Sequence, residues 1–330
     1  MHPFLRAAAA RQHGVVTTRD LARAGITPQE VRRAVVNGAW VRLRRGAFVE
    51  ATALAAADAA GERHLVEAAA VVRTVDRPGA VLSGYSAATV WGLPTPRRLA
   101  GTVTLTDPDQ HRRGRGYVIT HGPLPPSSTT VHRGLPVTTL ARTVVDCARA
   151  WSMEEAVILA DAARWGDRLT AAELGAALDA AADHRGAAAA RRAAGLARDG
   201  ADSPLETLTR LRLHESDVDE PDLQVRISAD GVVHEADGWF GVHGIVMACD
   251  GRGKYRQPWG TTTEQKHWQE KRQREVLVAA GVRFWTVTND DVEDGWPRAL
   301  ARLLELMART PPVPLRVVVS GERRRRPRAG

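Results

Sequence analysis

The chain has 330 residues, which predicts two or three domains, and its content of 44% hydrophobic and 25% charged residues is typical of soluble globular proteins. No run approaches the roughly 18 uninterrupted apolar residues of a membrane-spanning helix, which excludes an integral membrane protein. The N-terminal segment 1–12 has basic residues on both sides of a short apolar patch, so we expect no secretory signal and a cytoplasmic location.

The formal net charge of +8 is concentrated at the two ends of the chain. Residues 1–50 contain nine Arg against three acidic residues, and residues 321–330 contain five Arg against one Glu. A coding bias toward Arg would also raise the total charge, but it does not explain where the charge lies. We therefore expect a polyanionic partner at the ends of the chain.

The N-terminal region has the pattern of a helix-turn-helix. Residues 3–12 can form a first helix. Two short helices follow, and each begins with the spacing of a capping box, in which a Thr precedes an acidic residue by three positions: Thr17 with Asp20, and Thr27 with Glu30. Two capped helices joined by a short turn predict a helix-turn-helix.

A strand-like segment at 40–45 and a returning strand at 47–49 predict a β-hairpin, or wing, directly after these helices. The second helix of such a pair enters the major groove of DNA. There Gln can read adenine and Arg can read guanine, while arginines on the wing suit phosphates or the minor groove. The candidate DNA-binding residues are Gln29, Arg32, Arg33, Arg42, Arg44 and Arg45. A winged helix can also mediate protein contacts, in which case these arginines only solvate its surface.

The stretch "GVVTTRDLARAGITPQEVRRAVVNGAWVRLRRGAFV" resembles the N-terminal winged-helix domain of the AbiEi family, the antitoxin half of type IV toxin-antitoxin systems. In that family the domain binds the promoter of its own operon. The resemblance implies that residues 1–50 are a DNA-binding domain, that DNA is a partner, and that a cognate toxin is a second candidate partner.

Residues 51–199 predict a mostly helical connector with one β-hairpin. Ala-rich amphipathic segments indicate the helices. Segments 102–108 and 116–122 read as the two strands of a hairpin that closes over the basic turn "DQHRRGRG". Arginines of this turn could contact phosphate, but a solvated turn is the preferred interpretation. The region looks like the connector found between an AbiEi-like head and a nuclease-like tail.

Residues 200–310 predict a separate α/β domain, so that the fold class is α/β multidomain. A helix capped by Ser203 precedes three strands, a long amphipathic helix and a returning strand, at 222–227, 233–240, 243–249, 262–280 and 282–288. This order forms the core of the restriction-endonuclease-like fold. The Pro-rich and then Arg-rich residues 311–330 are expected to form a disordered tail that adds non-specific phosphate affinity.

Residues 200–296 resemble the very-short-patch-repair-like endonuclease domains of the PD-(D/E)XK superfamily. The residues that match the family pattern are Glu206, Asp237, Asp250 with Gly251, Lys254 with Tyr255, Arg272 or Arg274, and Thr288. The resemblance implies catalytic places for Glu206, Asp237, Asp250 and Lys254. It also implies that Asp237 and Asp250 would hold Mg²⁺, which activates water and polarises the phosphate.

Ala248 departs from this pattern at a decisive position. The family has a metal-binding Glu two residues before the Asp of its Asp-Gly pair, and a methyl group cannot hold a hard cation. Strand alternation would place Asp250 on the same face as residue 248, and Glu235 lies beside Asp237, so either could substitute. We nevertheless expect a degenerate site.

The leading hypothesis is a DNA-binding transcriptional repressor or antitoxin-like protein with a degenerate endonuclease-like domain. One alternative is an active Mg²⁺-dependent DNA endonuclease, which would need Mg²⁺ as its cofactor. A second alternative is a protein-interaction scaffold in which neither end binds DNA.

Overall fold

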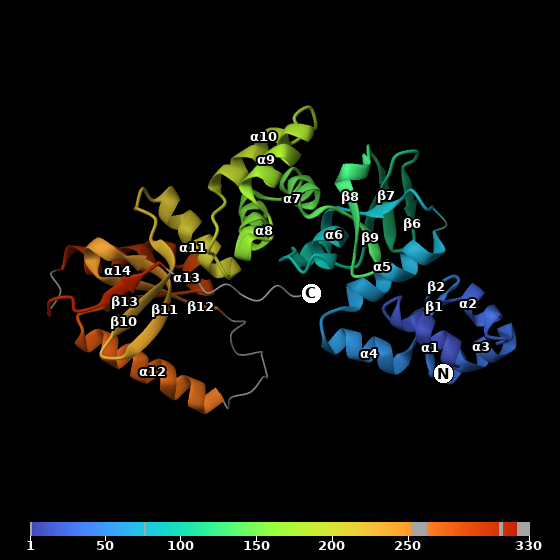
Figure 1. The fold of residues 1–330 in the computed structure, drawn as a ribbon, viewed down its shortest axis with the longest axis horizontal. Coiled ribbons are helices and arrows are strands. Elements are labelled where there is room, and N and C mark those ends of the chain that lie inside the picture. Colours follow the sequence, from blue (N-terminus) through green and yellow to red (C-terminus); the bar gives the residue numbers. More distant parts are fainter. Residues whose placement is uncertain (1, 76, 252–262, 310–312, 322–330) are drawn as a thin grey trace. The chain divides into compact units, whose positions relative to one another are not determined.

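The computed structural model describes residues 2–75, 77–251, 263–309 and 313–321, with side chains omitted over 263–270 (Figure 1). The protein is a mixed α/β, multidomain chain. Contacts divide it into one unit of residues Met1–Leu159 and Leu169–Gly195 and a second unit of residues Ala160–Arg168 and Leu196–Gly330. Among the described residues, no helix combines the length and apolar character that crossing a bilayer requires.

The N-terminal part of the first unit has the fold of a winged helix. Its elements are α1 (Pro3–Ala10), β1 (Val15–Thr17), α2 (Thr18–Arg23), α3 (Pro28–Val36), β2 (Trp40–Arg44) and β3 (Ala47–Glu50). Both predicted capping boxes are present, at Thr17 with Asp20 and at Thr27 with Glu30. The strands form an antiparallel sheet in the order β1-β3-β2. The predicted helix-turn-helix and wing are therefore confirmed as secondary structure.

The region after residue 50 contains a second sheet, of six strands, in the order β6-β7-β5-β4-β9-β8. Its elements are α4 (Ala51–Ala59), α5 (Arg63–Thr74), β4 (Val81–Leu82), α6 (Gly84–Val90), η1 (Arg97–Leu99), β5 (Val103–Asp107), β6 (Arg112–Gly114), β7 (Tyr117–His121), η2 (Pro126–Ser128), β8 (Thr129–His132), β9 (Leu135–Thr138), α7 (Leu140–Ala148), α8 (Met153–Arg164), η3 (Trp165–Asp167), α9 (Ala171–Ala180) and α10 (Ala187–Leu196).

The predicted hairpin between segments 102–108 and 116–122 is wrong. Strands β5 and β7 pair in parallel, and Arg112–Gly114, which was assigned to the turn, forms strand β6 and pairs antiparallel with β7. The actual turn is Arg115–Gly116, where Gly116 has a φ of 75° that glycine tolerates without strain. Local alternation identified both long strands, but it cannot distinguish parallel from antiparallel pairing.

The two sheets of the first unit share one hydrophobic core. Val15 and Val49 of the winged helix belong to the same buried cluster as Leu65 of α5 and as Leu105 and Ile119 of the six-stranded sheet. Helix α5 contacts strands of both sheets. The packing unit that contains residues 1–50 therefore continues well beyond them.

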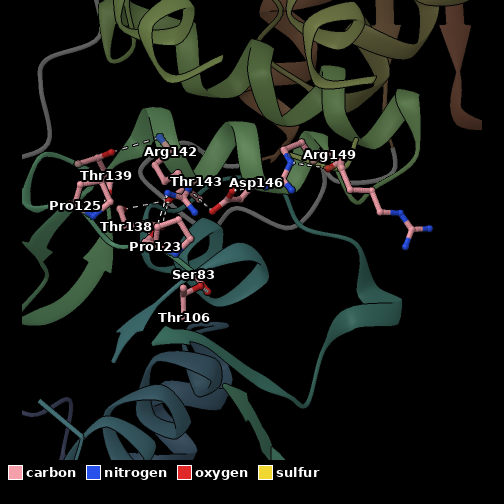
Figure 2. A network of polar contacts seen from close by, with 12 residues as sticks. Ser83, Thr106, Pro123, Pro125, Thr138, Thr139, Arg142, Thr143, Asp146 and Arg149 are labelled. Carbon is pink, nitrogen blue, oxygen red and sulfur yellow. Dashed lines mark hydrogen bonds and ion pairs between the residues drawn. The ribbon is translucent and has the colours of Figure 1, made fainter. Parts of the chain in front are cut away.

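Helix α7 is fixed to the six-stranded sheet by a polar network, which Figure 2 shows. At its start, the hydroxyl oxygens of Thr138 and Thr143 lie 2.7 Å apart and both side chains are buried. Further along, Asp146 accepts hydrogen bonds from Arg142 Nε at 2.7 Å and from Arg149 Nη1 at 3.1 Å. The Thr138–Thr143 contact joins the helix to β9, while the contacts of Asp146 lie within the helix and its C-terminal cap.

The second unit is built on a five-stranded mixed sheet in the order β13-β12-β11-β10-β14. Its elements are α11 (Pro204–Glu215), β10 (Asp222–Ala229), β11 (Val232–Phe240), η4 (Gly241–His243), β12 (Ile245–Asp250), α12 (Thr263–Ala279), β13 (Arg283–Thr288), α13 (Asn289–Glu293), α14 (Trp296–Ala308) and β14 (Val318–Ser320). Only the β12–β13 pair is parallel among these strands.

Two hydrophobic clusters show that helices cover both faces of this sheet (Figure 1). Leu205 of α11 and Leu303 of α14 pack against Met247 in one cluster. Leu277 of α12 packs against Val246 in the other. Since residues 246 and 247 of a strand point to opposite faces, the sheet forms the middle of three layers.

A buried ion pair lies within the second unit between Arg210 of α11 and Asp161 of α8. Their nitrogen and oxygen are 3.0 Å apart, and both side chains are at most 1% exposed. The Asp161 carboxylate also accepts hydrogen bonds from the Thr207 hydroxyl at 2.9 Å and the Arg198 backbone N–H at 2.7 Å. Burial raises the pKa of Asp161, which these partners oppose. The pair fastens residues 160–168 to α11.

Candidate nucleic-acid interface and candidate metal site

The predicted recognition helix α3 packs one face on the winged-helix core and exposes the other. Val31 and Val35 are partly buried against a small core that includes Leu21 and Phe48. The capping box fixes where the helix begins, since the Thr27 N–H and hydroxyl both donate to Glu30 at 2.7 Å. These contacts hold the pKa of Glu30 below its usual value. A short helix is thereby stabilised at its N-terminus.

The exposed face of α3 carries the predicted base-reading residues at helical spacing. Gln29, Arg32, Arg33 and Val36 are exposed, and their separations of three, four and seven positions place them on one face. Val36 is 88% exposed, an unusual position for an apolar side chain. An apolar group beside amide and guanidinium groups matches a major groove, which offers thymine methyls beside polar base edges.

The wing presents Arg42 and Arg45 to solvent but not Arg44. The β2–β3 register shifts between Arg42 and Arg44, which interrupts strand alternation and turns Arg44 away from the solvent face. Its guanidinium carbon lies 4.7 Å from the centre of the Tyr117 ring on β7. Burial lowers the pKa of Arg44. The structure thus places this predicted DNA-binding residue in a packing contact.

The four exposed arginines of α3 and the wing form no ion pair within the part of the chain that the structure describes: Arg32, Arg33, Arg42 and Arg45. Their charges are therefore available to a ligand. Tyr117 was not predicted as part of this surface. No signal in the sequence links it to the wing, because the two lie about 70 positions apart and meet only through packing of the two sheets.

Glu206 and Asp237, the first two predicted catalytic residues, are brought together in the second unit. Glu206 lies in the first turn of α11 and is 4% exposed. Its carboxylate accepts hydrogen bonds from Ser203 Oγ at 2.8 Å, from the Asp202 N–H at 2.9 Å and from Gln224 Nε2 at 3.0 Å. Burial, together with the negative charge of Asp237, raises the pKa of Glu206 to about 7.

Asp237 lies where the pairing of β10 and β11 is interrupted. Gln224 would be its partner, but it has a positive φ of 52° and the register of the two strands omits both residues. Asp237 Oδ2 accepts a hydrogen bond from the Cys249 N–H on β12 at 2.7 Å. An irregular strand position thus directs this carboxylate to the β12 backbone.

Two other positions of the predicted site lie on strand β12. Ala248 is half-buried and packs in the cluster that contains Val276 and Phe284. Asp250 is exposed at the end of β12, opposite Thr288 in the register. Lys254 lies outside the described residues, so its predicted place stays a prediction.

The described side chains supply only part of a Mg²⁺ site. A hard cation needs several oxygen donors, yet position 248 offers a methyl group and both Glu206 oxygens already accept protein hydrogen bonds. The described part of the chain holds no group of three or more His, Cys, Asp or Glu side chains arranged for a metal ion. What the arrangement does supply is a buried carboxyl beside a second carboxylate.

Comparison with known proteins gives one family match. Residues 3–51 match the family model described as "Transcriptional regulator, AbiEi antitoxin". The matched segment runs from the start of α1 to the residue after β3, which is the winged helix. No curated protein matches the chain.

Proposed function

We propose that the protein is a DNA-binding transcriptional repressor of the toxin-antitoxin kind, which binds DNA upstream of its own gene. The observation that carries the proposal is the exposed face of α3, where Gln29, Arg32 and Arg33 are exposed on a capped helix. The match of residues 3–51 to antitoxin regulators supports the same function. A cognate toxin is the second partner that this function implies.

The proposed roles of the α3 and wing residues follow from the chemistry of the DNA grooves and backbone. Gln29 is suited to adenine and Arg32 or Arg33 to guanine, because amide and guanidinium groups can each form two hydrogen bonds to those base edges. Arg42 and Arg45 on the wing are suited to phosphates, which fix the orientation of the protein without reading sequence.

The second unit, in this proposal, is a restriction-endonuclease-like domain that has lost cleavage. A mixed sheet between helices, with Glu206 and Asp237 close together, supports the likeness. Ala248 and the hydrogen-bonded state of Glu206 support the loss. The proximity of the two carboxylates also favours a second candidate, an active Mg²⁺-dependent endonuclease in which Asp250 and Lys254 complete the site.

A binding assay tests the repressor function. The purified full chain is titrated onto a duplex containing its own upstream DNA and onto a scrambled duplex of equal length. Replacing Arg33 with Gln should weaken binding to the specific duplex by about 1 to 3 kcal/mol and reduce the difference between the two duplexes. Arg192→Gln, on an exposed and unpaired arginine of α10, is the control. Failure of the wild type to bind either duplex would refute the function.

A cleavage assay with Mg²⁺ separates the two candidates for the second unit. The degenerate domain predicts no cleavage by the wild type, and a gain of cleavage in Ala248→Glu would show that one lost ligand accounts for it. Cleavage by the wild type that disappears in Asp237→Ala would instead establish the active endonuclease.

A further inference from the structure

The β6–β7 hairpin of the first unit carries a second basic surface. His111, Arg112, Arg113 and Arg115 are all exposed. Within the described ranges, none of the three arginines forms an ion pair with a carboxylate. Three guanidinium groups within four positions, without counter-charges, produce a strong local positive potential.

The nearest acidic residues along the chain do not neutralise this hairpin. Asp107 is fully buried and Asp109 is exposed, and Arg77 binds both, with nitrogen–oxygen distances of 3.1 Å to each. The pairing with Arg77 lowers the pKa of Asp107. Both carboxylates are therefore engaged by Arg77, and the hairpin arginines remain available.

Tyr117 joins the hairpin to the wing. Its ring contacts two guanidinium groups, that of Arg44 on β2 at 4.7 Å and that of Arg112 on β6 at 5.9 Å from the ring centre. The ring lies across the hairpin backbone at Gly114, where a Cβ would approach Tyr117 Cε1 to 2.2 Å. Glycine is needed there for the ring to lie between the two arginines.

The two guanidinium groups at this ring are close enough to repel. Besides burial, the charge of Arg112 contributes to the lowered pKa of Arg44. Like charges held together in partly buried surroundings are relieved by an anion, and phosphate accepts paired hydrogen bonds from guanidinium. The contacts of Tyr117 with Arg44 and Arg112 thus place the basic hairpin beside strand β2 of the wing.

We propose that Arg112, Arg113 and Arg115 of the β6–β7 hairpin bind the phosphate backbone of the same duplex that the winged helix reads. This inference rests on the proposed DNA-binding function and extends its contact surface beyond residues 1–50. The hairpin contributes affinity rather than sequence recognition, because phosphates are the same at every base pair.

The salt dependence of DNA binding tests the hairpin. The full chain and the double variant Arg113→Gln/Arg115→Gln are titrated onto the upstream duplex and the scrambled duplex at several salt concentrations. The guanidinium groups at the Tyr117 ring belong to Arg44 and Arg112, which are both kept, so the wing should hold its position. Each lost phosphate contact lowers the slope of log affinity against log salt by about 0.9, so the double variant should lose about 1.8.

The same change means that, from about 50 to about 200 mM salt, the wild type should lose about tenfold more affinity than the double variant. Both duplexes should show the same loss of slope, and discrimination between them should persist. The matched control is Arg185→Gln/Arg192→Gln, which removes equal charge from exposed arginines of the first unit that form no described ion pair. Its slope should equal that of the wild type.

The outcomes distinguish the hairpin from the repressor function. If the wild type binds and Arg33→Gln weakens specific binding, but the hairpin variant keeps the wild-type slope, the hairpin proposal is wrong and the repressor function stands. An equal loss of slope in the control would also overturn it, because net charge would then explain the effect. If the wild type binds no DNA, both proposals fail.

Discussion

Replacing Glu206 with glutamine tests the electrostatic state of the buried carboxyl pair. The pKa of Glu206 is raised from an ordinary 4.5 to about 7 by burial and by Asp237. Between these values the folded protein retains a proton that the unfolded chain loses. Stability is therefore full below about pH 4.5 and falls as the pH rises to about 7, with a cost of about 3 kcal/mol above that value.

The assay is urea unfolding of the full chain at several values from about pH 5 to about pH 8. The transition of the second unit is identified as the one that Leu213→Ala shifts, because Leu213 is fully buried in that unit. A glutamine cannot ionise, so the pH dependence of this transition should largely disappear in Glu206→Gln. At the lower pH the variant should be less stable, since its amide nitrogen cannot accept the hydrogen bonds that Glu206 receives.

The matched control is Glu173→Gln. Glu173 occupies the same place in the capping box of α9, but it is solvent-exposed and its hydrogen bonds with Thr170 lower its pKa. The Glu173→Gln substitution should therefore leave the pH dependence of the free energy of unfolding above about pH 5 as it is in the wild type. The reasoning would be refuted if the wild-type free energy of unfolding did not change over this pH range. It would also be refuted if the free energy of unfolding of Glu206→Gln fell with pH as steeply as that of the wild type.

Three further predictions concern packing. Thermal or urea unfolding measures stability in each, and titration onto the upstream duplex measures the DNA affinity of the arginine variants. Asp161→Ala should cost about 3 to 5 kcal/mol, because it removes the nearer carboxylate of the fully buried Arg210 and leaves only the longer contact with Glu220 at 3.6 Å; a cost below about 1 kcal/mol would contradict this. Arg44→Gln should reduce stability, while Arg45→Gln should reduce DNA affinity and leave stability unchanged; equal effects on both properties would mean that Arg44 is not primarily a packing residue. Gly114→Ala should cost about 1 to 3 kcal/mol, since its methyl group would overlap the Tyr117 ring, and an unchanged midpoint would show that the ring moves freely.

The starts of several helices could be predicted from the sequence, because the signals for them lie close together in the chain. The Thr-x-x-acid pairs at Thr17 and Thr27 marked the starts of α2 and α3, and the Ser203 cap marked the start of α11. Each signal lies within one helical turn, where a side chain satisfies free backbone N–H groups regardless of the rest of the fold.

Pairing between distant segments was not predictable in the same way. The antiparallel hairpin assigned to β5 and β7 was wrong, because a period of two residues reports burial of a strand and not its direction. Similarly, Asp161 lies in an Ala-rich helix that looked like a plain connector. Its partner Arg210 is 49 positions away, so nothing local marked it as the centre of a buried network.

The candidate sites, too, were predictable from local patterns but not where they depend on distant contacts. Arg44 was predicted to bind DNA with the other wing arginines, but the register shift in β2 turns it from the solvent face. Glu206 and Asp237 were predicted to share a site and do interact. Glu206 also accepts a hydrogen bond from Gln224, an irregular residue of β10 that no local pattern marked.

The interleaving of the two units limits how this protein can be divided. The chain passes between them after Leu159, Arg168 and Gly195, so helix α8 begins in one and ends in the other. A cut after residue 50 would expose Val15 and Val49 to water, whereas a cut after Gly195 would leave Asp161 without Arg210. Exchange of the whole first unit between proteins of this architecture, by recombination or by engineering, would therefore have to keep a compatible partner for Arg210.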